Sequence, residues 1–266
     1  MIFSSKTHSF IIFCFCILIK TNVHATPYEF KRNLDYTLVS TGIGLSLFAY
    51  TSDKQKQGIS ENEYSQLNKN NVNRIDRALM FPFNQTAARI SDVLVFSSLA
   101  TPLVQLRKQA EYSLIALMYA ESVLLSTGLN QVSKARVERP RPYMYDTGTN
   151  TELVFNKDSM RSFFSAHATT ISNSLVFASK VYLDLNPNYP YQTRLWIFTG
   201  SVIATGAALR VIAGYHFVTD VVIGVVVGSI IGYQIPQLHK KSNQKTVSYL
   251  PFMTSEAVGI NFQYRF

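Results

Sequence analysis

Six long apolar segments constrain what this chain can fold into. Each is long enough for a helix of several turns and too long for an ordinary strand. The segments run over Leu34–Tyr50, Ala88–Leu106, Tyr112–Leu129, Ala168–Leu185, Leu195–Ala213 and Phe217–Ile235. The sequence therefore predicts an all-α protein built as a bundle of six helices.

The apolar character of these segments is uneven. Hydrophobic residues make up 47% of the chain and charged residues 15%, yet the mean hydropathy is only +0.07. Ser172 and Asn173 interrupt the fourth segment. Gly224, Gly228 and Gly232 recur every four residues in the last, a spacing that predicts a smooth face for close helix packing. Composition leaves two forms open, an integral membrane bundle and a membrane-associated periplasmic domain.

The first 25 residues are typical of a secretory signal peptide. Lys6 precedes an apolar run from Phe10 to Ile19. Val23 and Ala25 put small residues at the positions that a signal peptidase recognises, which predicts cleavage before Thr26. The alternative is an uncleaved anchor, but the run is shorter than the ~20 residues of a membrane span. Both cysteines, Cys14 and Cys16, lie in this leader. We therefore expect a signal peptide at 1–25, a helical domain at 26–240 and a tail at 241–266, with no disulfide.

The tail has a different pattern. Hydrophobic residues alternate with Gly259, Asn261, Gln263 and Arg265. This period of two predicts a strand that ends the chain, and Val247–Phe252 is its expected hairpin partner. One hairpin cannot close a membrane barrel, so we expect a small β-hairpin packed on the helical domain.

Three segments concentrate residues that bind phosphate and transfer protons. The first holds Lys134 and Arg141, with Pro142 after it. The second is Ser165-Ala166-His167, and the third holds Arg210, His216 and Asp220. Cations and imidazoles in this combination can stabilise a phosphoryl group and break a bond to it.

These segments resemble the signature of the type 2 phosphatidic acid phosphatase and vanadium haloperoxidase superfamily. That signature is Lys-x6-Arg-Pro, then Pro-Ser-Gly-His, then Ser-Arg-x5-His-x3-Asp. The order and the helical context match, and the resemblance covers roughly residues 35–236. Three positions depart from the pattern: Phe164, Ala166 and Leu209. The resemblance implies a six-helix bundle of the phosphatidic acid phosphatase type 2 kind.

The resemblance also implies the roles of the site residues. His216 is the expected nucleophile, and Asp220, one helical turn further on, is expected to fix its tautomer. His167 is the expected general acid and then base. The phosphate is expected to contact five residues: Lys134, Arg141, Ser165, Ala166 and Arg210.

Three further basic residues lie near these motifs or near the end of the bundle. Arg136 and Arg139 are left open as phosphate-contacting, substrate-orienting or surface residues. His239, beside Lys240 and Lys241, is given no role.

The function implied is metal-independent removal of phosphate from a membrane lipid or lipid-linked phosphate through a phosphohistidine. A vanadium-dependent haloperoxidase, a soluble periplasmic acid phosphatase and a non-catalytic envelope protein are the alternatives. No cluster along the chain has metal-ligand spacing, so neither metal nor cofactor is expected. The net charge of +9 suits anionic partners, but no nucleic-acid motif is present. The leader predicts export, with the site in the periplasm or at the membrane. If the leader is cleaved and all six helices span, three crossings would instead place the site in the cytoplasm, so the topology stays open.

Overall fold

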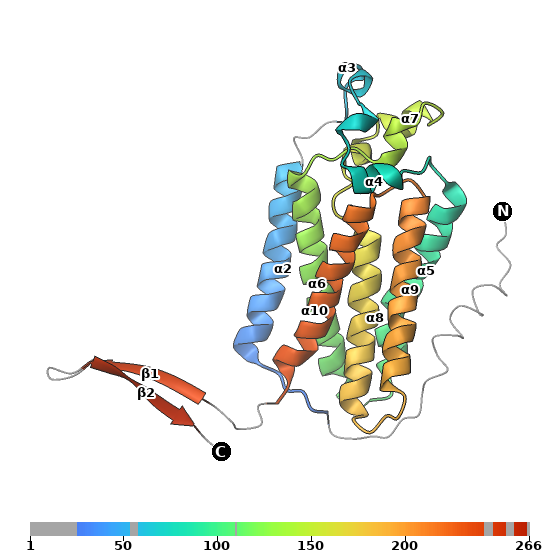
Figure 1. Ribbon diagram of the computed structural model, residues 1–266. Coiled ribbons are helices and arrows are strands. Elements are labelled where there is room, and N and C mark those ends of the chain that lie inside the picture. Colours follow the sequence, from blue (N-terminus) through green and yellow to red (C-terminus); the bar gives the residue numbers. More distant parts are fainter. Residues whose placement is uncertain (1–25, 54–57, 110, 242–246, 254–257, 265–266) are drawn as a thin grey trace.

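The computed structural model describes residues 26–53, 58–109, 111–241, 247–253 and 258–264. Six long helices occupy most of the described residues and lie side by side in an elongated bundle (Figure 1). They are α2 Arg32–Asp53, α5 Gln85–Leu106, α6 Tyr112–Arg136, α8 Ala166–Leu185, α9 Gln192–Ile212 and α10 Val218–His239. All six predicted helices are confirmed, with ends that differ by a few residues. The predicted signal peptide at 1–25 lies outside the described residues.

Helix α8 is the central element of the bundle. It packs against α5, α6, α9 and α10, and most of its residues are buried. Its polar residues bond within the bundle: Ser172 Oγ donates to the Ala168 carbonyl at 2.8 Å, and Ser174 Oγ lies 2.8 Å from the Tyr119 hydroxyl. Buried polar groups stabilise a core only when they are paired in this way. The polar interruptions in this segment therefore belong to a central helix.

Helix α10 contacts α8 through its row of glycines. A Cβ atom at Gly228 would lie 2.2 Å from the Thr169 carbonyl oxygen, and one at Gly232 would lie 2.4 Å from the Asn173 carbonyl oxygen. Only glycine allows two helix backbones to approach this closely. The close packing predicted from the spacing of the glycines is confirmed.

Short elements cover the upper end of the bundle as drawn in Figure 1. Between α2 and α5 lie α3 Glu61–Ser65, the 3-10 turn Lys69–Asn71 and α4 Arg74–Ala78; between α6 and α8 lie the 3-10 turn Pro142–Tyr145, α7 Thr151–Val154 and the 3-10 turn Lys157–Met160. A separate hydrophobic cluster that includes Tyr143 and Val154 holds this cover together. The lower end has only short turns, where the Glu29 amide bonds to the His239 carbonyl at 2.9 Å.

No strand lies within the described residues between 26 and 241. In the tail, β1 Val247–Met253 pairs with β2 Val258–Tyr264 in antiparallel register, and Val247 lies opposite Tyr264. These are the residues that the alternating pattern assigned to a hairpin. Figure 1 shows the hairpin standing clear of the helices, whereas we expected it to pack against them.

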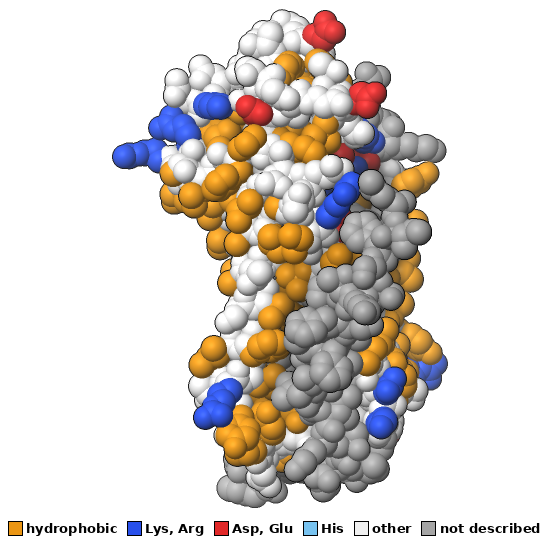
Figure 2. Space-filling model, turned by 90° about the vertical axis from the view of Figure 1, so that its right-hand side faces the viewer, with side chains coloured by type: hydrophobic (Ala, Val, Ile, Leu, Met, Phe, Trp, Pro, Cys, Tyr) orange, Lys and Arg blue, Asp and Glu red, His pale blue; other side chains and the backbone are white. Residues whose placement is uncertain are grey.

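The sides of the bundle are suited to a hydrocarbon environment. Four helices, α5, α6, α9 and α10, are long and apolar enough to cross a membrane. Large apolar side chains point outward along them, such as Phe96 at 70% exposure and Ile197 at 64%. On the face shown in Figure 2, hydrophobic side chains follow the length of the bundle and Lys and Arg side chains lie toward its ends. A helix of 22 residues is about 33 Å long, close to the thickness of a bilayer core.

Candidate active site

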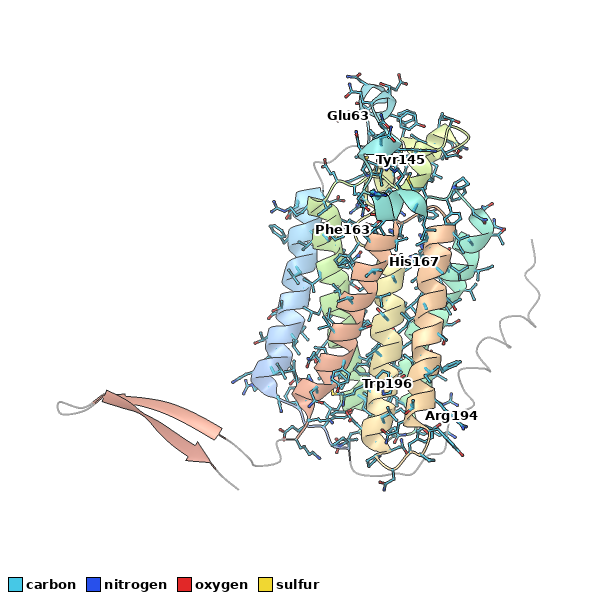
Figure 3. The ribbon with its side chains drawn as sticks, in the orientation of Figure 1. Glu63, Tyr145, Phe163, His167, Arg194 and Trp196 are labelled. Carbon is cyan, nitrogen blue, oxygen red and sulfur yellow. The ribbon has the colours of Figure 1, made fainter. Side chains whose placement is uncertain are left out.

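The three phosphate-binding segments meet at the upper end of the bundle. Long helices that follow one another along the chain run in opposite directions, so the end of α6, the start of α8 and the turn between α9 and α10 lie at the same end. His167 is labelled there in Figure 3, near Phe163 and below Tyr145. The helix order therefore brings together side chains that lie far apart in the sequence.

His216 lies in the turn between α9 and α10 and is almost completely buried. The turn begins at Gly214, whose φ of 72° is readily adopted only by glycine. The imidazole Nδ1 lies 2.7 Å from the Ser162 carbonyl oxygen, which can only accept a hydrogen bond. We therefore assign the proton to Nδ1, which leaves Nε2 with its lone pair.

The surroundings of His216 disfavour its protonated form. Burial lowers the pKa of the imidazole well below its usual value, and the nearby cations of Arg141, Arg210 and Lys134 lower it further. A neutral imidazole with a free Nε2 can act as a nucleophile.

Asp220, which we expected to fix the tautomer of His216, lies near the imidazole but forms its hydrogen bonds with other groups. Its Oδ2 lies 3.9 Å from His216 Nδ1 and instead accepts hydrogen bonds from Ser162 Oγ at 2.5 Å and from the Phe217 amide at 2.9 Å. The expectation assumed one turn of helix between the two residues, but α10 begins only at Val218. Asp220 therefore acts on the imidazole indirectly, by holding the residue whose carbonyl bonds to it.

His167 is paired with a carboxylate that the motifs do not contain. Its Nε2 lies 2.7 Å from Oδ1 of Asp92 on α5. Asp92 follows Ser91, and the two form a polar pair within an apolar segment of the sequence. That interruption was the one available signal, and it does not reveal which residue the carboxylate contacts.

Arg210 and Arg141 lie on the same aromatic ring. Their guanidinium carbons are 4.4 and 4.7 Å from the centre of the Tyr215 ring. Arg210 also donates to Ser91 Oγ at 3.0 Å, while its buried Nε has no hydrogen-bond partner among the described residues. Arg141 donates from Nε to the Asp158 carbonyl at 2.8 Å. The Tyr215 ring and these hydrogen bonds hold both guanidinium groups in place. The buried Nε of Arg210 stays available to donate to an anion.

The start of α8 supplies further donors. Ser165 caps this helix, because its Oγ accepts a hydrogen bond from the Ala168 amide at 3.3 Å. Its own amide donates to the Asp220 carbonyl at 3.1 Å, so this amide is not free for a phosphate. Ala166 is the first residue of α8, where amides have no acceptor within the helix and favour anions.

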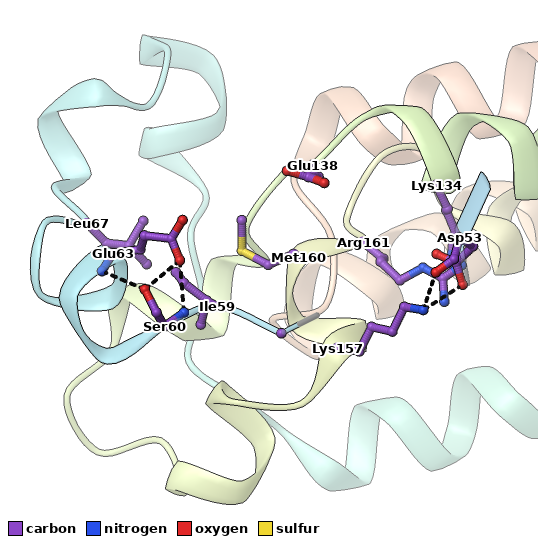
Figure 4. Close-up of a pocket in the computed structure, with 11 residues that line it drawn as sticks. Asp53, Ile59, Ser60, Glu63, Leu67, Lys134, Glu138, Lys157, Met160 and Arg161 are labelled. Carbon is purple, nitrogen blue, oxygen red and sulfur yellow. Dashed lines mark hydrogen bonds and ion pairs between the residues drawn. The ribbon is translucent and has the colours of Figure 1, made fainter. Parts of the chain in front are cut away.

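Lys134 lies in the last turn of α6 and lines a cavity of about 540 Å³ at the upper end. Figure 4 shows that Lys157 and Arg161 line the same cavity, and both pair with Asp53, at 3.0 and 3.2 Å. Neither His167 nor His216 lines it. The two histidines therefore lie outside the lining of this cavity, whereas Lys134 lines it and its charge also lowers the pKa of His216.

Arg136 and Arg139, whose roles the sequence left open, have different surroundings. Arg139 pairs with Asp76 at 2.6 Å and with Asp220, and its guanidinium stacks on the Phe217 ring at 4.2 Å. Arg136 lies over the Phe48 ring at 4.9 Å. Arg139 therefore connects α4 to the start of α10 rather than facing the histidines. Asp76, which the sequence reasoning missed, is its partner.

The model of the PAP2 superfamily matches residues 115–244, which include all three motifs. The chain belongs to the PAP2 superfamily. It is thereby a PAP2-family phosphatase, a phosphoric monoester hydrolase. Of the three departures from the family signature, Leu209 packs with Ala87, Ala88 and Ala213, so an apolar contact replaces the usual hydroxyl.

A solved structure also aligns with this PAP2 chain. It is described as the first transmembrane PAP2-type phosphatidylglycerolphosphate phosphatase from Bacillus subtilis. The two share 16% sequence identity, the alignment covers 90% of this chain and 97% of the other, and the TM-score is 0.42. No curated protein matches the chain.

Proposed function

We propose that this protein removes phosphate from a membrane lipid or a lipid-linked phosphate through a phosphohistidine at His216. One observation carries the proposal. The buried imidazole has its Nδ1 held by the Ser162 carbonyl, and its Nε2 has no hydrogen-bond partner among the described residues. Arg141, Arg210 and Lys134 supply positive charge to this region. This is the arrangement that attack on a phosphorus atom requires.

The reaction has two steps. In the first, His216 Nε2 bonds to phosphorus and the bond from phosphorus to the lipid oxygen breaks, while His167 gives that oxygen a proton. In the second, His167 takes a proton from a water molecule, whose oxygen bonds to phosphorus as the bond to Nε2 breaks. Arg141, Arg210, Lys134 and the Ser165–Ala166 helix start stabilise the charge on the phosphoryl oxygens.

The membrane-spanning character of the helices supports a lipid substrate. Four candidate spans and their outward apolar side chains support an arrangement in which the upper end lies close to the bilayer surface. A phosphate attached to a lipid headgroup would reach the site from that surface. This surface also favours the integral form of the protein over the peripheral one.

We propose that the site faces the exported side. The short connections at the lower end carry Arg107, Lys108, Lys240 and Lys241, and basic residues in short loops favour the cytoplasm. Cleavage of a signal peptide before Thr26 would instead start α2 on the exported side and turn the site inward.

Single-cysteine labelling tests this orientation. With Cys14 and Cys16 replaced by serine, we expect Ser65→Cys at the upper end to react with a membrane-impermeant maleimide in intact cells. Asn188→Cys at the lower end should react only after lysis. The reverse pattern would overturn the orientation, and the mass of the purified chain shows whether residues 1–25 are removed.

Phosphate release from a panel of lipids tests the activity. The panel holds phosphatidic acid, phosphatidylglycerol phosphate, undecaprenyl diphosphate and lipid A in mixed micelles. We expect release from at least one lipid, its loss in His216→Ala, and an acid-labile phosphoenzyme that His167→Ala accumulates. Unchanged release in His216→Ala would reject the mechanism, and vanadate-dependent bromide oxidation without phosphate release would favour the haloperoxidase alternative.

A further inference from the structure

A second group of ionisable side chains is buried at the lower end of the bundle, away from the candidate active site. Asp35 of α2, Glu121 of α6 and His239 of α10 converge there, with exposures of 2%, 0% and 0%. His239 Nε2 lies 3.2 Å from Asp35 Oδ1 and 3.3 Å from Glu121 Oε2. His239 adjoins two lysines in the sequence, and for that reason we expected no role for it. The structure corrects this, since its side chain points into the bundle.

The hydrogen bond of the imidazole fixes which nitrogen faces the carboxylates. His239 Nδ1 lies 2.8 Å from the Ile235 carbonyl oxygen, which can only accept. Nδ1 therefore carries a proton, and in the neutral imidazole Nε2 presents a lone pair to two carboxylates. This arrangement is repulsive unless a cation or an additional proton lies among the three groups. Histidines that bind metals commonly donate their other N–H to a backbone carbonyl in this way.

Glu121 provides an independent observation. Both of its carboxylate oxygens are buried, and neither has a hydrogen-bond partner among the described residues. An unpaired buried carboxylate is strongly destabilising unless it is neutralised or coordinates a metal. Asp35 differs, because its Oδ2 accepts from the Lys31 amide at 2.7 Å and only Oδ1 faces the histidine.

The lysines at this end are engaged elsewhere. Lys31 Nζ donates to the Leu238 and Lys240 carbonyls at 2.9 and 2.8 Å, and Lys241 Nζ donates to the Thr26 carbonyl. Lys180 and Lys240 pair with Asp184. The described contacts of these lysines therefore leave the two carboxylates of the cluster without a basic side chain to neutralise them.

We propose that Asp35, Glu121 and His239 bind a divalent transition metal of the Zn²⁺ class. Zinc bonds of about 2.0–2.2 Å in a tetrahedron separate neighbouring ligand atoms by about 3.3–3.5 Å. The two separations at His239, 3.2 and 3.3 Å, are close to these values, and all three ligand atoms lie within 4.8 Å of one another. Imidazole together with carboxylates favours zinc-like metals over Mg²⁺ or Ca²⁺. The charge of the ion would balance the two carboxylates.

The site is structural rather than part of phosphate transfer. Its ligands come from three helices that meet at the lower end, and the His239 carbonyl also accepts a hydrogen bond from the Glu29 amide. The metal would therefore tie α2, α6 and α10 together where the chain enters and leaves the bundle. The proposal is independent of the proposed phosphatase mechanism, which involves no metal.

Metal content gives a direct test. The full chain is purified without a histidine tag in mild detergent, loaded with Zn²⁺, passed through a desalting column and measured by mass spectrometry of the metal. We expect about one ion per chain in the wild type and binding weakened by about 100-fold in Glu121→Gln and His239→Gln, because even groups behind the ligands change affinity 10–100-fold. Asp184→Asn is the matched control, an acidic residue at the same end that should retain the ion.

A second measurement covers the case in which the variants do not fold. In the wild type, Co²⁺ should give the intense visible absorption of tetrahedral coordination, and a chelator should abolish it and lower the thermal unfolding temperature. A wild type that retains no Zn²⁺ or Co²⁺ after desalting overturns the proposal and leaves a proton shared among the imidazole and the two carboxylates. Equal metal content in the wild type and in a folded His239→Gln variant also overturns it.

Discussion

His167 Nε2 lies 2.7 Å from Asp92 Oδ1, so a carboxylate on α5 holds the histidine at the start of α8. The carboxylate favours the protonated imidazole and orients the ring, but burial and the nearby Arg210 charge outweigh it and lower the pKa of His167 to about 4. We expect Asp92→Asn to lower kcat by about tenfold, because a general acid typically contributes 10²–10⁴-fold and this change removes its support. KM should change less, because the contact of Asp92 with Arg210 is longer, at 3.8 Å. Steady-state kinetics on the best lipid of the panel measures this.

Asp158→Asn is the comparison for that substitution, since it alters a carboxylate that contacts Arg141 rather than a histidine. It should act mainly on KM through the phosphate-binding arginine. If Asp92→Asn changes only KM, the carboxylate orients substrate and does not support His167.

The low pKa of His216 predicts where activity is lost in acid. Burial and three nearby cations favour the neutral imidazole, so its pKa lies below the usual 6.5. Neutral His216 is the reactive form, so kcat/KM should decrease in acid as His216 becomes protonated. We expect the midpoint of that decrease to lie below pH 6.5. A pH profile from 4 to 9 checks this. A limb centred above pH 6.5 that Arg141→Gln leaves unmoved would contradict this account of the charge around His216.

Arg139 is expected to stabilise the fold more than it contributes to catalysis. It pairs with Asp76 and Asp220, both fully buried, and its loss would leave two buried carboxylates without their cation. Removing one partner of a buried pair costs about 3–5 kcal/mol. Denaturant unfolding of Arg139→Gln in detergent should show a loss of that size. Arg136→Gln, whose guanidinium only lies over Phe48, should lose less than about 1 kcal/mol.

The glycine row of α10 predicts a contrast between two helical glycines. A Cβ at Gly228 would lie 2.2 Å from a backbone oxygen of α8, whereas one at Gly200 on α9 meets nothing within 4 Å. We expect Gly228→Ala to destabilise the bundle by about 1–3 kcal/mol through overpacking. Gly200→Ala should be neutral or stabilising by up to about 1 kcal/mol. Thermal unfolding in one detergent compares them, and equal effects would mean that α10 does not pack on α8 as described.

The sequence predicted the helices well because their signals are local. Apolar runs and the four-residue glycine spacing lie within single segments, and all six helices form where they were expected. The three motifs also converge at one end, since alternating helix directions require it. The tail strands fall where a period of two placed them.

Other features depend on contacts between distant segments. Asp92 lies 75 residues from His167, and Ser162 lies 54 residues from the imidazole that it holds. The expectation that Asp220 fixes the His216 tautomer assumed that one helical turn joins the two residues, but α10 begins at Val218, two residues after His216.

The residue types of the active site could therefore be read from the sequence alone, because each motif is a short run whose chemistry is carried by its own side chains. Only the tertiary structure decided which partners hold those side chains. It also decided that His239 lies with Asp35 and Glu121, 204 residues separating it from Asp35. Such pairs form when helices that are distant in sequence pack together, and no local pattern records that packing.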